Sequence, residues 1–359
     1  MKIKKLSETE ILFKADKVLR DALGKVPFID IISSERGKPL GKFKVDLFVN
    51  LIIDGNKKQS LIVEVKYNGQ PRMARDAVNQ LFRYREVCPE SYLIFMADYI
   101  SPQAAEICRS DGVGYIDVVG NVFLSIGHIY IEQTGKPNPF SRKRDIVSLV
   151  SQRSSRVTRV LLNNPWRFWK TQELADEAKV SLGQISNVNK FLLDRDWVTK
   201  GKGFLLTQPW LLLDEFAKAY TYRKNEVWNY YSSMSISEIE TTIADICGTK
   251  GIENAMTGFS GAARLAPVVH HNHTMCYVNN IEDVVLAMNL KEVESGANVT
   301  LLAPYDEGVY YNTQVVEGIK IVSPIQIFLD VRGFKGGGEE VADTILRDVI
   351  KPKWATVEK

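Results

Sequence analysis

The chain has 359 residues, of which 45% are hydrophobic and 25% charged, with 46 Lys and Arg against 43 Asp and Glu. This length predicts two or three domains that each bury a core, and the composition is that of an ordinary soluble globular protein. No apolar run reaches the ~18 residues of a membrane span, no apolar signal core follows the basic start, and the scattered cysteines form no CxxC pair. We therefore expect a cytoplasmic protein without a membrane segment or a zinc ribbon.

Residues 1–140 show the pattern of a layered α/β domain. Ser7-Glu8-Thr9-Glu10 is a capping box, which opens a helix whose apolar side includes Ile11, Ala15 and Leu19. The other expected elements are strands over 26–33, 43–53, 60–67 and 91–97, helices over 71–87 and from Ser101, and a terminal hairpin over 113–133. The order of helices and strands predicts a mixed α/β domain, followed by a linker over 134–139.

Two acidic residues and a lysine lie on neighbouring strands of this domain. Asp46 is on the second expected strand, and Glu64 and Lys66 share one face of the third because side chains alternate along a strand. If the two strands pair, the two carboxylates can hold Mg²⁺ through hard oxygen ligands. Lys66 would then orient the attacking water and offset charge on a phosphate, and Gln80 on the next helix would complete the site.

The segments KVDLFVN and LIVEVKYNG, with the helix that bears Gln80, resemble the D…ExK pattern of the PD-(D/E)XK nuclease superfamily over roughly residues 7–133. The resemblance implies a nuclease-like fold with Asp46, Glu64, Lys66 and Gln80 as catalytic residues and Mg²⁺ held by Asp46 and Glu64. Val45 stands where many members carry proline. The alternative is a half-buried, salt-bridged cluster on a scaffold that only binds DNA.

Residues 171–206 predict a winged helix-turn-helix, which we place in a second domain over 141–224. Thr171 is an N-cap candidate for a first helix, and Ser181 can cap a second helix that runs to about Asp194. The stretch 197–206 follows as strand, Gly-punctuated turn and strand, with lysines at its tip. Two helices joined by a short turn and followed by a hairpin are typical of a module that binds double-stranded DNA.

The second helix would present amides, hydroxyls and a cation to a DNA groove. Ile185, Val188 and Leu192 fall on one face, which turns the polar residues outward. Amide side chains suit base edges, and lysines suit phosphates. The predicted DNA-binding residues are Ser181, Gln184, Ser186, Asn187, Lys190, Lys200 and Lys202. The alternative is a winged helix that serves only as a protein contact.

The net charge of +3 conceals a strong asymmetry along the chain. Residues 141–203 carry 13 Lys and Arg against 6 Asp and Glu, a net of +7. Residues 225–359 carry 10 against 18, a net of −8. A basic segment that coincides with the helix-turn-helix favours phosphate contact, whereas an acidic third domain favours a protein partner.

The third region begins after the expected helix in LLLDEFAKAYTYRKNEVWNYY. Two later segments, NAMTGFSGAARLAPVV and IVSPIQIFLDVRGFKGGGEEVADTIL, together with the winged helix resemble the AbiEi-type antitoxin and transcriptional regulator family of type IV toxin–antitoxin systems. The resemblance extends over roughly residues 145–350, and Ser323-Pro324-Ile325-Gln326 through Leu329-Asp330 is its most specific part. It implies an α+β C-terminal domain over 225–359 and a cognate toxin or other protein as partner. A homodimer remains an open alternative.

His270, His271 and His273, with Cys276 following, raise the question of a zinc site. On a strand His271 and His273 would share a face while His270 points away, and no third ligand is placed nearby. Polar rim histidines are the favoured interpretation. The leading function is thus a DNA-binding regulator or antitoxin, and the alternative is a Mg²⁺-dependent endonuclease delivered by its winged helix.

Overall fold

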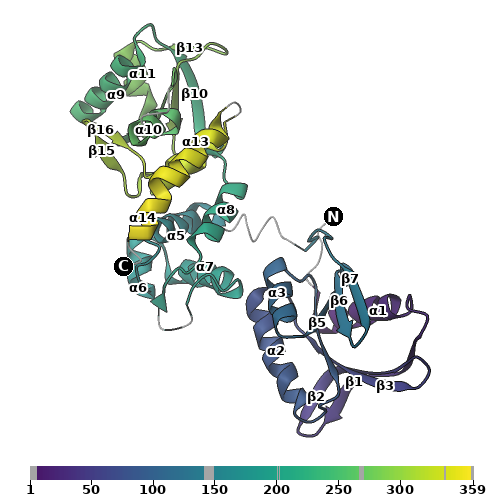
Figure 1. Ribbon diagram of the computed structural model, residues 1–359. Coiled ribbons are helices and arrows are strands. Elements are labelled where there is room, and N and C mark those ends of the chain that lie inside the picture. The colour runs from purple at the N-terminus through teal and green to yellow at the C-terminus, as the bar shows by residue number, and fades with distance from the viewer. Residues whose placement is uncertain are drawn as a thin grey trace. The chain divides into compact units, whose positions relative to one another are not determined.

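A computed structural model describes residues 6–140, 149–199, 201, 203–266, 271–334 and 337–356. The chain forms two compact units, of which the first holds the residues up to Arg142 and the second holds most of those from Lys143 onward (Figure 1). Most of the segment predicted as a helix-turn-helix belongs to the same unit as the acidic C-terminal region, whereas Leu193–Asp196 are assigned to the first unit. The division between them near residue 224 stays a prediction.

The first unit is a seven-stranded mixed sheet whose strands lie in chain order. The central strands β3, β4 and β5 are parallel, and every other neighbouring pair is antiparallel. Its elements are α1 (Glu8–Leu23), β1 (Ile29–Leu40), β2 (Phe43–Ile53), β3 (Lys57–Val65), α2 (Pro71–Arg85), β4 (Tyr92–Ala97), α3 (Pro102–Ser110), β5 (Gly114–Asp117), β6 (Val122–Ile126) and β7 (Ile129–Gln133).

Helices cover both faces of this sheet, so each face buries its own core (Figure 1). On one face α1 packs Ile11, Ala15 and Leu19 against alternate residues of β2, such as Leu47 and Val49. On the other face α2 and α3 pack against the remaining strand residues. Burial on both faces explains why the central strands read as continuous apolar runs.

Most of these elements were predicted correctly from the sequence, but the prediction for residues 113–133 was wrong. The capping box is confirmed, because the Ser7 hydroxyl accepts from the Glu10 N–H while the Glu10 carboxylate accepts from the Ser7 N–H. Residues 113–133 form three short strands rather than a single hairpin, because a second turn at Gly127 follows the turn at Gly120-Asn121. The mixed α/β class is confirmed.

The second unit begins with a helical part. Its elements are α5 (Gln152–Asn163), β8 (Trp169–Lys170), α6 (Thr171–Glu177), α7 (Leu182–Asp194), β9 (Gly203–Phe204) and α8 (Pro209–Ala219). Thr171 lies inside α6, and Lys170 takes the N-cap position. The Ser181 hydroxyl accepts from the Gln184 N–H, and Ile185, Val188 and Leu192 are buried, so the predicted cap and apolar face of α7 are confirmed.

A second seven-stranded sheet follows, in the order β13-β10-β14-β12-β11-β16-β15. Pairs β12–β14 and β11–β16 are parallel, and the other pairs are antiparallel. The elements are η1 (Tyr222–Lys224), β10 (Glu226–Tyr231), α9 (Ile236–Lys250), β11 (Asn254–Met256), α10 (Gly258–Leu265), β12 (Thr274–Val278), α11 (Ile281–Met288), β13 (Lys291–Glu292), β14 (Val299–Ala303), η2 (Glu307–Tyr310), β15 (Gln314–Val316), β16 (Ile319–Ile321), α12 (Pro324–Val331), α13 (Gly338–Ile345), η3 (Leu346–Ile350) and α14 (Lys351–Thr356).

A fully buried carboxylate, that of Asp330 on α12, connects the sheet to the helical part. Its oxygens accept from the hydroxyls of Tyr220 at 2.6 Å, Thr257 at 2.5 Å and Tyr277 at 3.1 Å, and from the Gln326 amide at 3.0 Å. Burial raises the pKa of Asp330, whereas these four donors lower it. Each donor comes from a different point of the unit, so the carboxylate fixes their relative positions.

The network extends into α5 through Arg159, which is 1% exposed. The Arg159 Nε donates to the Gln326 side-chain oxygen at 2.8 Å, and the guanidinium lies 5.4 Å from the Phe216 ring centroid on α8. Its two Nη atoms have no hydrogen-bond partner among the described residues. A buried guanidinium of this kind is costly unless its surroundings stay intact, so α5, α8 and α12 depend on one another.

The last helix, α14, is hydrogen-bonded to the end of α5 and the residues after it. The Trp354 indole donates to the Leu162 carbonyl at 3.1 Å, and the Trp166 indole donates to the Trp354 carbonyl at 2.6 Å. Figure 1 shows α13 and α14 running from the C-terminal sheet to the helical part. No helix among the described residues is long and apolar enough to cross a membrane.

We expect Asp330→Ala to lower the free energy of unfolding of the second unit by at least ~3 kcal/mol, because it leaves several buried donors unsatisfied. The exposed Asp343→Ala on α13 should change it by less than ~0.5 kcal/mol. Urea unfolding followed by tryptophan fluorescence measures this, since all six tryptophans lie beyond residue 165 and report on this unit. Equal effects of the two substitutions would remove the network from its central role.

Candidate functional site

Asp46 and Glu64 meet where β2 and β3 stop pairing. The antiparallel register ends at Leu47 opposite Val63, which places the next two residues, Asp46 and Glu64, side by side. Both lie on the face that α2 covers. The Asp46 Oδ2 accepts from the Val65 N–H at 2.8 Å, so this carboxylate takes over a hydrogen bond that the strand ladder no longer supplies.

Glu64 is buried and accepts from two side chains. Lys66 Nζ lies 2.5 Å from its Oε1, and the Tyr84 hydroxyl on α2 donates to its Oε2 at 3.0 Å. Burial, joined by the charge of Asp46, raises the pKa of Glu64 despite these two partners. Burial lowers the pKa of Lys66, but the hydrogen bond and charge of Glu64 outweigh it and raise that pKa. Gln80 hydrogen-bonds Tyr84.

The four residues predicted from the D…ExK pattern therefore lie in one cluster, and Tyr84 is a fifth member that the D…ExK pattern did not include. Tyr84 follows Gln80 by four residues, the spacing of one helix face, and this signal could have found it. Burial and the charge of Glu64 raise the pKa of Tyr84 to about 12, so its hydroxyl stays a donor at neutral pH.

The donor set fits a hard divalent cation, because Asp46 and Glu64 offer carboxylate oxygens from adjacent strands. In the structure Lys66 and Tyr84 occupy the oxygens of Glu64 instead. Among the described residues no group of three or more His, Cys, Asp or Glu side chains is placed to hold a metal ion. The cluster is thus a charge-compensated arrangement with two candidate metal ligands.

A second candidate site is the outer face of α7. Ser186, Asn187 and Lys190 are exposed there, and Asn187 and Lys190 make no side-chain hydrogen bond within the described residues. Gln184 is half-buried, and its amide donates to the Ser154 hydroxyl of α5 at 2.6 Å. Ser181 serves as the N-terminal cap of the helix. Asn187 and Lys190 are therefore the predicted contacts that are most available to a ligand.

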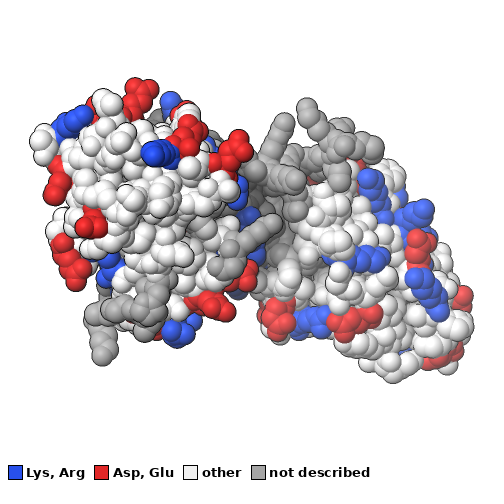
Figure 2. Space-filling model, turned by 90° about the horizontal axis from the view of Figure 1, so that it is seen from above, with Lys and Arg blue, Asp and Glu red and all other residues white. Residues whose placement is uncertain are grey.

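A small antiparallel ribbon follows α7. The Thr199 N–H donates to the Leu205 carbonyl, and the Thr207 N–H donates to the Trp197 carbonyl. β9 also pairs with β8, which precedes α6. Lys200 and Lys202 lie outside the described residues. On the face shown in Figure 2 acidic and basic side chains are interspersed, so the charge argument rests on the contrast between segments of the sequence.

The histidines that raised the question of zinc lie beside α10 and β12. His271 Nε2 lies 3.0 Å from the Glu240 carboxylate, which also pairs with Arg264. His273 contacts the Ala297 carbonyl with one ring nitrogen and the Thr300 hydroxyl with the other. His270 lies outside the described residues. Both described histidines face a cavity together with polar and aromatic side chains.

A comparison with protein families finds a match in the C-terminal part of the chain. Residues 205–351 match the model of a family described as transcriptional regulator, AbiEi antitoxin, type IV toxin–antitoxin system. The match begins before α8 and includes Gln326 and Asp330, but it leaves out α5, α6 and α7. It is therefore shorter than the range of roughly 145–350 expected from the sequence. No curated protein matches the chain.

Two solved structures are similar to about a third of the chain. One is a repair endonuclease from Pyrococcus abyssi, with 19% identity over 33% of this chain and 49% of that chain and a TM-score of 0.23. The other is a complex of EndoMS with double-stranded DNA, with 15% identity over 32% of this chain and 47% of that chain and a TM-score of 0.21. The matched region spans about half the length of each of these two proteins. The roles considered for Asp46, Glu64, Lys66 and Gln80 rest on the contacts of these residues alone.

The raised pKa of Glu64 gives a prediction for the pH dependence of stability. A group whose pKa is higher in the folded state contributes its full stability below the unfolded pKa and loses it as pH rises through the folded pKa. Glu64→Gln, which mimics the neutral form, should therefore melt at a higher temperature than the wild type at about pH 8, and the difference should shrink toward about pH 4.

Melting followed by circular dichroism measures this effect, with tryptophan fluorescence as an internal reference for the second unit. Glu106→Gln on α3, an exposed carboxyl in the same unit, is the matched control and should leave the melting temperature unchanged. A lower melting temperature for Glu64→Gln at about pH 8 would mean that the Lys66 ion pair outweighs the cost of burial.

Proposed function

We propose that the chain is a double-stranded DNA-binding transcriptional regulator of the antitoxin type, with a PD-(D/E)XK-like first unit and a winged helix-turn-helix built from α6, α7 and the ribbon after α7. The second of these helices is the DNA-reading element. The acidic region from residue 225 meets a protein partner, for which a cognate toxin is the first candidate. The protein acts in the cytoplasm.

One observation carries this proposal: the division of α7 into a buried apolar face and an exposed face with Ser186, Asn187 and Lys190. A short turn joins α7 to α6, and a paired ribbon follows it, which is the order of elements in a winged helix. The segment from 141 to 203 has a net charge of +7, which suits a phosphate backbone. The family match to transcriptional regulators supports the same function from a neighbouring segment.

The charge of the C-terminal region supports a protein rather than DNA as its partner. Residues 225–359 have a net charge of −8, which repels a duplex and attracts a basic surface. The matched family is that of type IV antitoxins, so a basic toxin fits both the charge and the match. A second copy of the chain is the alternative, and light scattering on the purified protein distinguishes them.

DNA binding gives a prediction that separates base contacts from phosphate contacts. Asn187→Ala should weaken binding to a selected preferred site by roughly 1–3 kcal/mol and change binding to random DNA little. Lys190→Gln should weaken binding to both DNAs and reduce the slope of log K against log salt by about one unit. Fluorescence anisotropy over a series of salt concentrations measures both effects.

Lys218→Gln is the matched control for Lys190, because Lys218 is exposed on α8 of the same unit and pairs with Asp214 and Glu215. It should leave both affinities within a factor of ~2. Equal losses on preferred and random DNA for Asn187→Ala would exclude a base-reading role for this residue. Unchanged affinity for both α7 variants would exclude α7 as the DNA-binding helix.

The cluster at Asp46 and Glu64 favours a second candidate function, that of a Mg²⁺-dependent endonuclease. Asp46 and Glu64 would hold the ion, which supplies an activated water and stabilises charge on the phosphate. Lys66 contacts Glu64, so an ion that took the place of its ammonium group there would leave Lys66 near that water to orient it, and Gln80 hydrogen-bonds Tyr84 beside them. The same residues equally form a compensated structural cluster, and the regulator is our preferred function.

We expect the purified chain to leave plasmid and linear DNA intact in Mg²⁺ or Mn²⁺, because Lys66 and Tyr84 already satisfy the carboxylate of Glu64. Asp46→Asn keeps an oxygen that can accept from the Val65 N–H, so this variant remains folded. Cleavage by the wild type that Asp46→Asn abolishes, at an unchanged melting temperature, would establish the endonuclease in place of our preferred function.

A further inference from the structure

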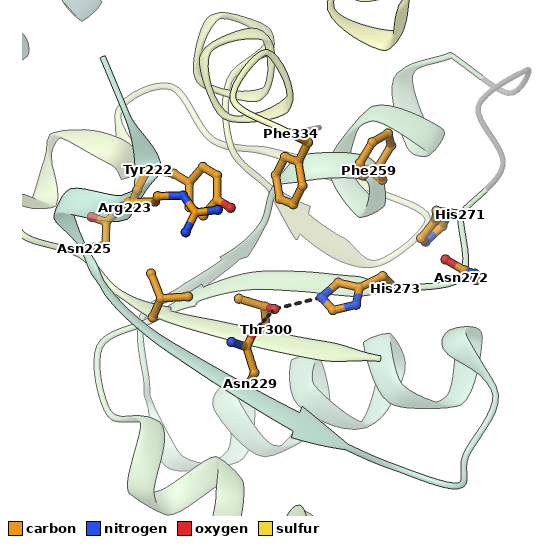
Figure 3. Close-up of a pocket in the computed structure, with 11 residues that line it drawn as sticks. Tyr222, Arg223, Asn225, Asn229, Phe259, His271, Asn272, His273, Thr300 and Phe334 are labelled. Atoms are coloured by element: carbon orange, nitrogen blue, oxygen red, sulfur yellow. Dashed lines mark hydrogen bonds between the residues drawn. The ribbon is translucent and has the colours of Figure 1, made fainter. Parts of the chain in front are cut away.

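A cavity of about 880 Å³ opens between the start of β10, α10 and the ends of β12 and β14. Figure 3 shows Phe334 and Phe259 along one wall and His273, Thr300 and Asn229 along the wall opposite. Arg223 lies toward one end, and His271 and Asn272 lie at the other. This volume is in the range of cavities that hold small organic ligands.

The first wall is an array of aromatic rings. Tyr222 and Phe334 are stacked, with ring centroids 4.9 Å apart and planes at 10°, and Phe259 meets Phe334 edge-on at 5.4 Å. Tyr222 is buried, whereas Phe259 and Phe334 are half-buried and line the cavity. Rings held by their neighbours form a ready platform for a flat heteroaromatic group, since stacking loses little side-chain freedom.

The opposite wall is polar and held in place. Both nitrogens of His273 are engaged, one with the Ala297 carbonyl at 3.1 Å and the other with the Thr300 hydroxyl at 2.8 Å. The Thr300 hydroxyl in turn donates to the Asn229 side chain at 2.7 Å (Figure 3). The side-chain amide of Asn272 makes no hydrogen bond within the described part of the chain, so it can pair with the polar edge of a ring.

The charge of the lining is opposite to that of its surroundings. Residues 225–359 hold 18 acids, yet the described residues that line the cavity include one permanent cation, Arg223, and no acidic side chain. The Arg223 guanidinium is exposed and forms no ion pair with a described carboxylate, and it lies 5.5 Å from the Tyr222 ring centroid. An unpaired guanidinium beside an aromatic platform is suited to a phosphate attached to a flat ring.

We propose that this cavity binds a free nucleotide, with the base packed against the aromatic wall of Phe334 and Phe259 and the phosphate held by Arg223. The assignment adds a small-molecule site to a region that is otherwise expected to meet a protein. It does not rest on DNA binding or on a toxin partner. Because no carboxylate among the described residues lines the cavity, the ligand binds without a divalent cation and without a group-transfer step.

Isothermal titration calorimetry of the full chain in EDTA, with ATP, GTP, CTP and UTP in separate titrations and no DNA present, tests the proposal. At least one nucleotide should bind with a Kd below ~1 mM. Adenosine and tripolyphosphate, which carry only the base or only the anion, should each bind at least ~10-fold more weakly, because each loses one wall of contacts. No binding of any nucleotide up to ~1 mM would overturn the site.

Variants locate the binding within the cavity. Arg223→Gln should weaken nucleotide binding about 10-fold or more, and Phe334→Leu, which keeps an apolar side chain without a ring, roughly fivefold or more. Arg347→Gln makes the same charge change at an exposed arginine that pairs with Asp348 on η3, and it should leave binding unchanged. Melting curves confirm that each variant is folded.

The proposal fails if Arg347→Gln and Arg223→Gln weaken binding equally, because the effect would then be one of net charge. It also fails if tripolyphosphate binds as tightly as the best nucleotide, which would indicate an adventitious ion only. A strict requirement for Mg²⁺ would contradict the acid-free lining. Because the titration contains no DNA, its failure leaves the proposed regulator function untouched.

Discussion

The second unit depends on one buried carboxylate, that of Asp330. Four hydrogen-bond donors converge on it from the residue after α8, from β12, from the residue before α10 and from Gln326 on its own helix. Gln326 passes the network on to the buried guanidinium of Arg159. A low-dielectric interior makes such a network costly to break in part and stable when complete, so it selects one arrangement of helices and sheet. The segment from Ser323 to Asp330, which carried the family resemblance, therefore supplies Gln326 and Asp330 to this network.

Glu64 in the first unit is buried too, but its environment is different. Asp330 is surrounded by neutral donors, whereas Glu64 has a lysine on one oxygen and a second carboxylate beside it. Burial raises the pKa of both groups. Of these two clusters, the one in the first unit combines two acids with a lysine where β2 and β3 stop pairing, which is why it is a candidate for chemistry while the Asp330 network is a candidate for stability.

The sequence predicted features that depend on local spacing. The Ser7–Glu10 capping box, the apolar face of α7 and the meeting of Asp46 with Glu64 follow from helix and strand periods, and the structure has all three. Long-range features were missed. Tyr220 and Tyr277 reach Asp330 across 110 and 53 residues of chain, and no local period announces such contacts. The aromatic and polar walls of the cavity likewise come from segments between Tyr222 and Phe334 that only the folded sheet brings together.

The hydrogen bonds of Trp354 to the end of α5 have a consequence for how the protein folds during synthesis. The first helix of the second unit receives its last neighbours only when residues near 354 have left the ribosome, because Leu162 and Trp166 bond to that tryptophan. The chain between them is almost 200 residues long, so the first unit can fold while the second still waits for its closing helix. Chains that stop before this tryptophan would thus carry a folded first unit and an α5 whose end lacks both of these hydrogen bonds.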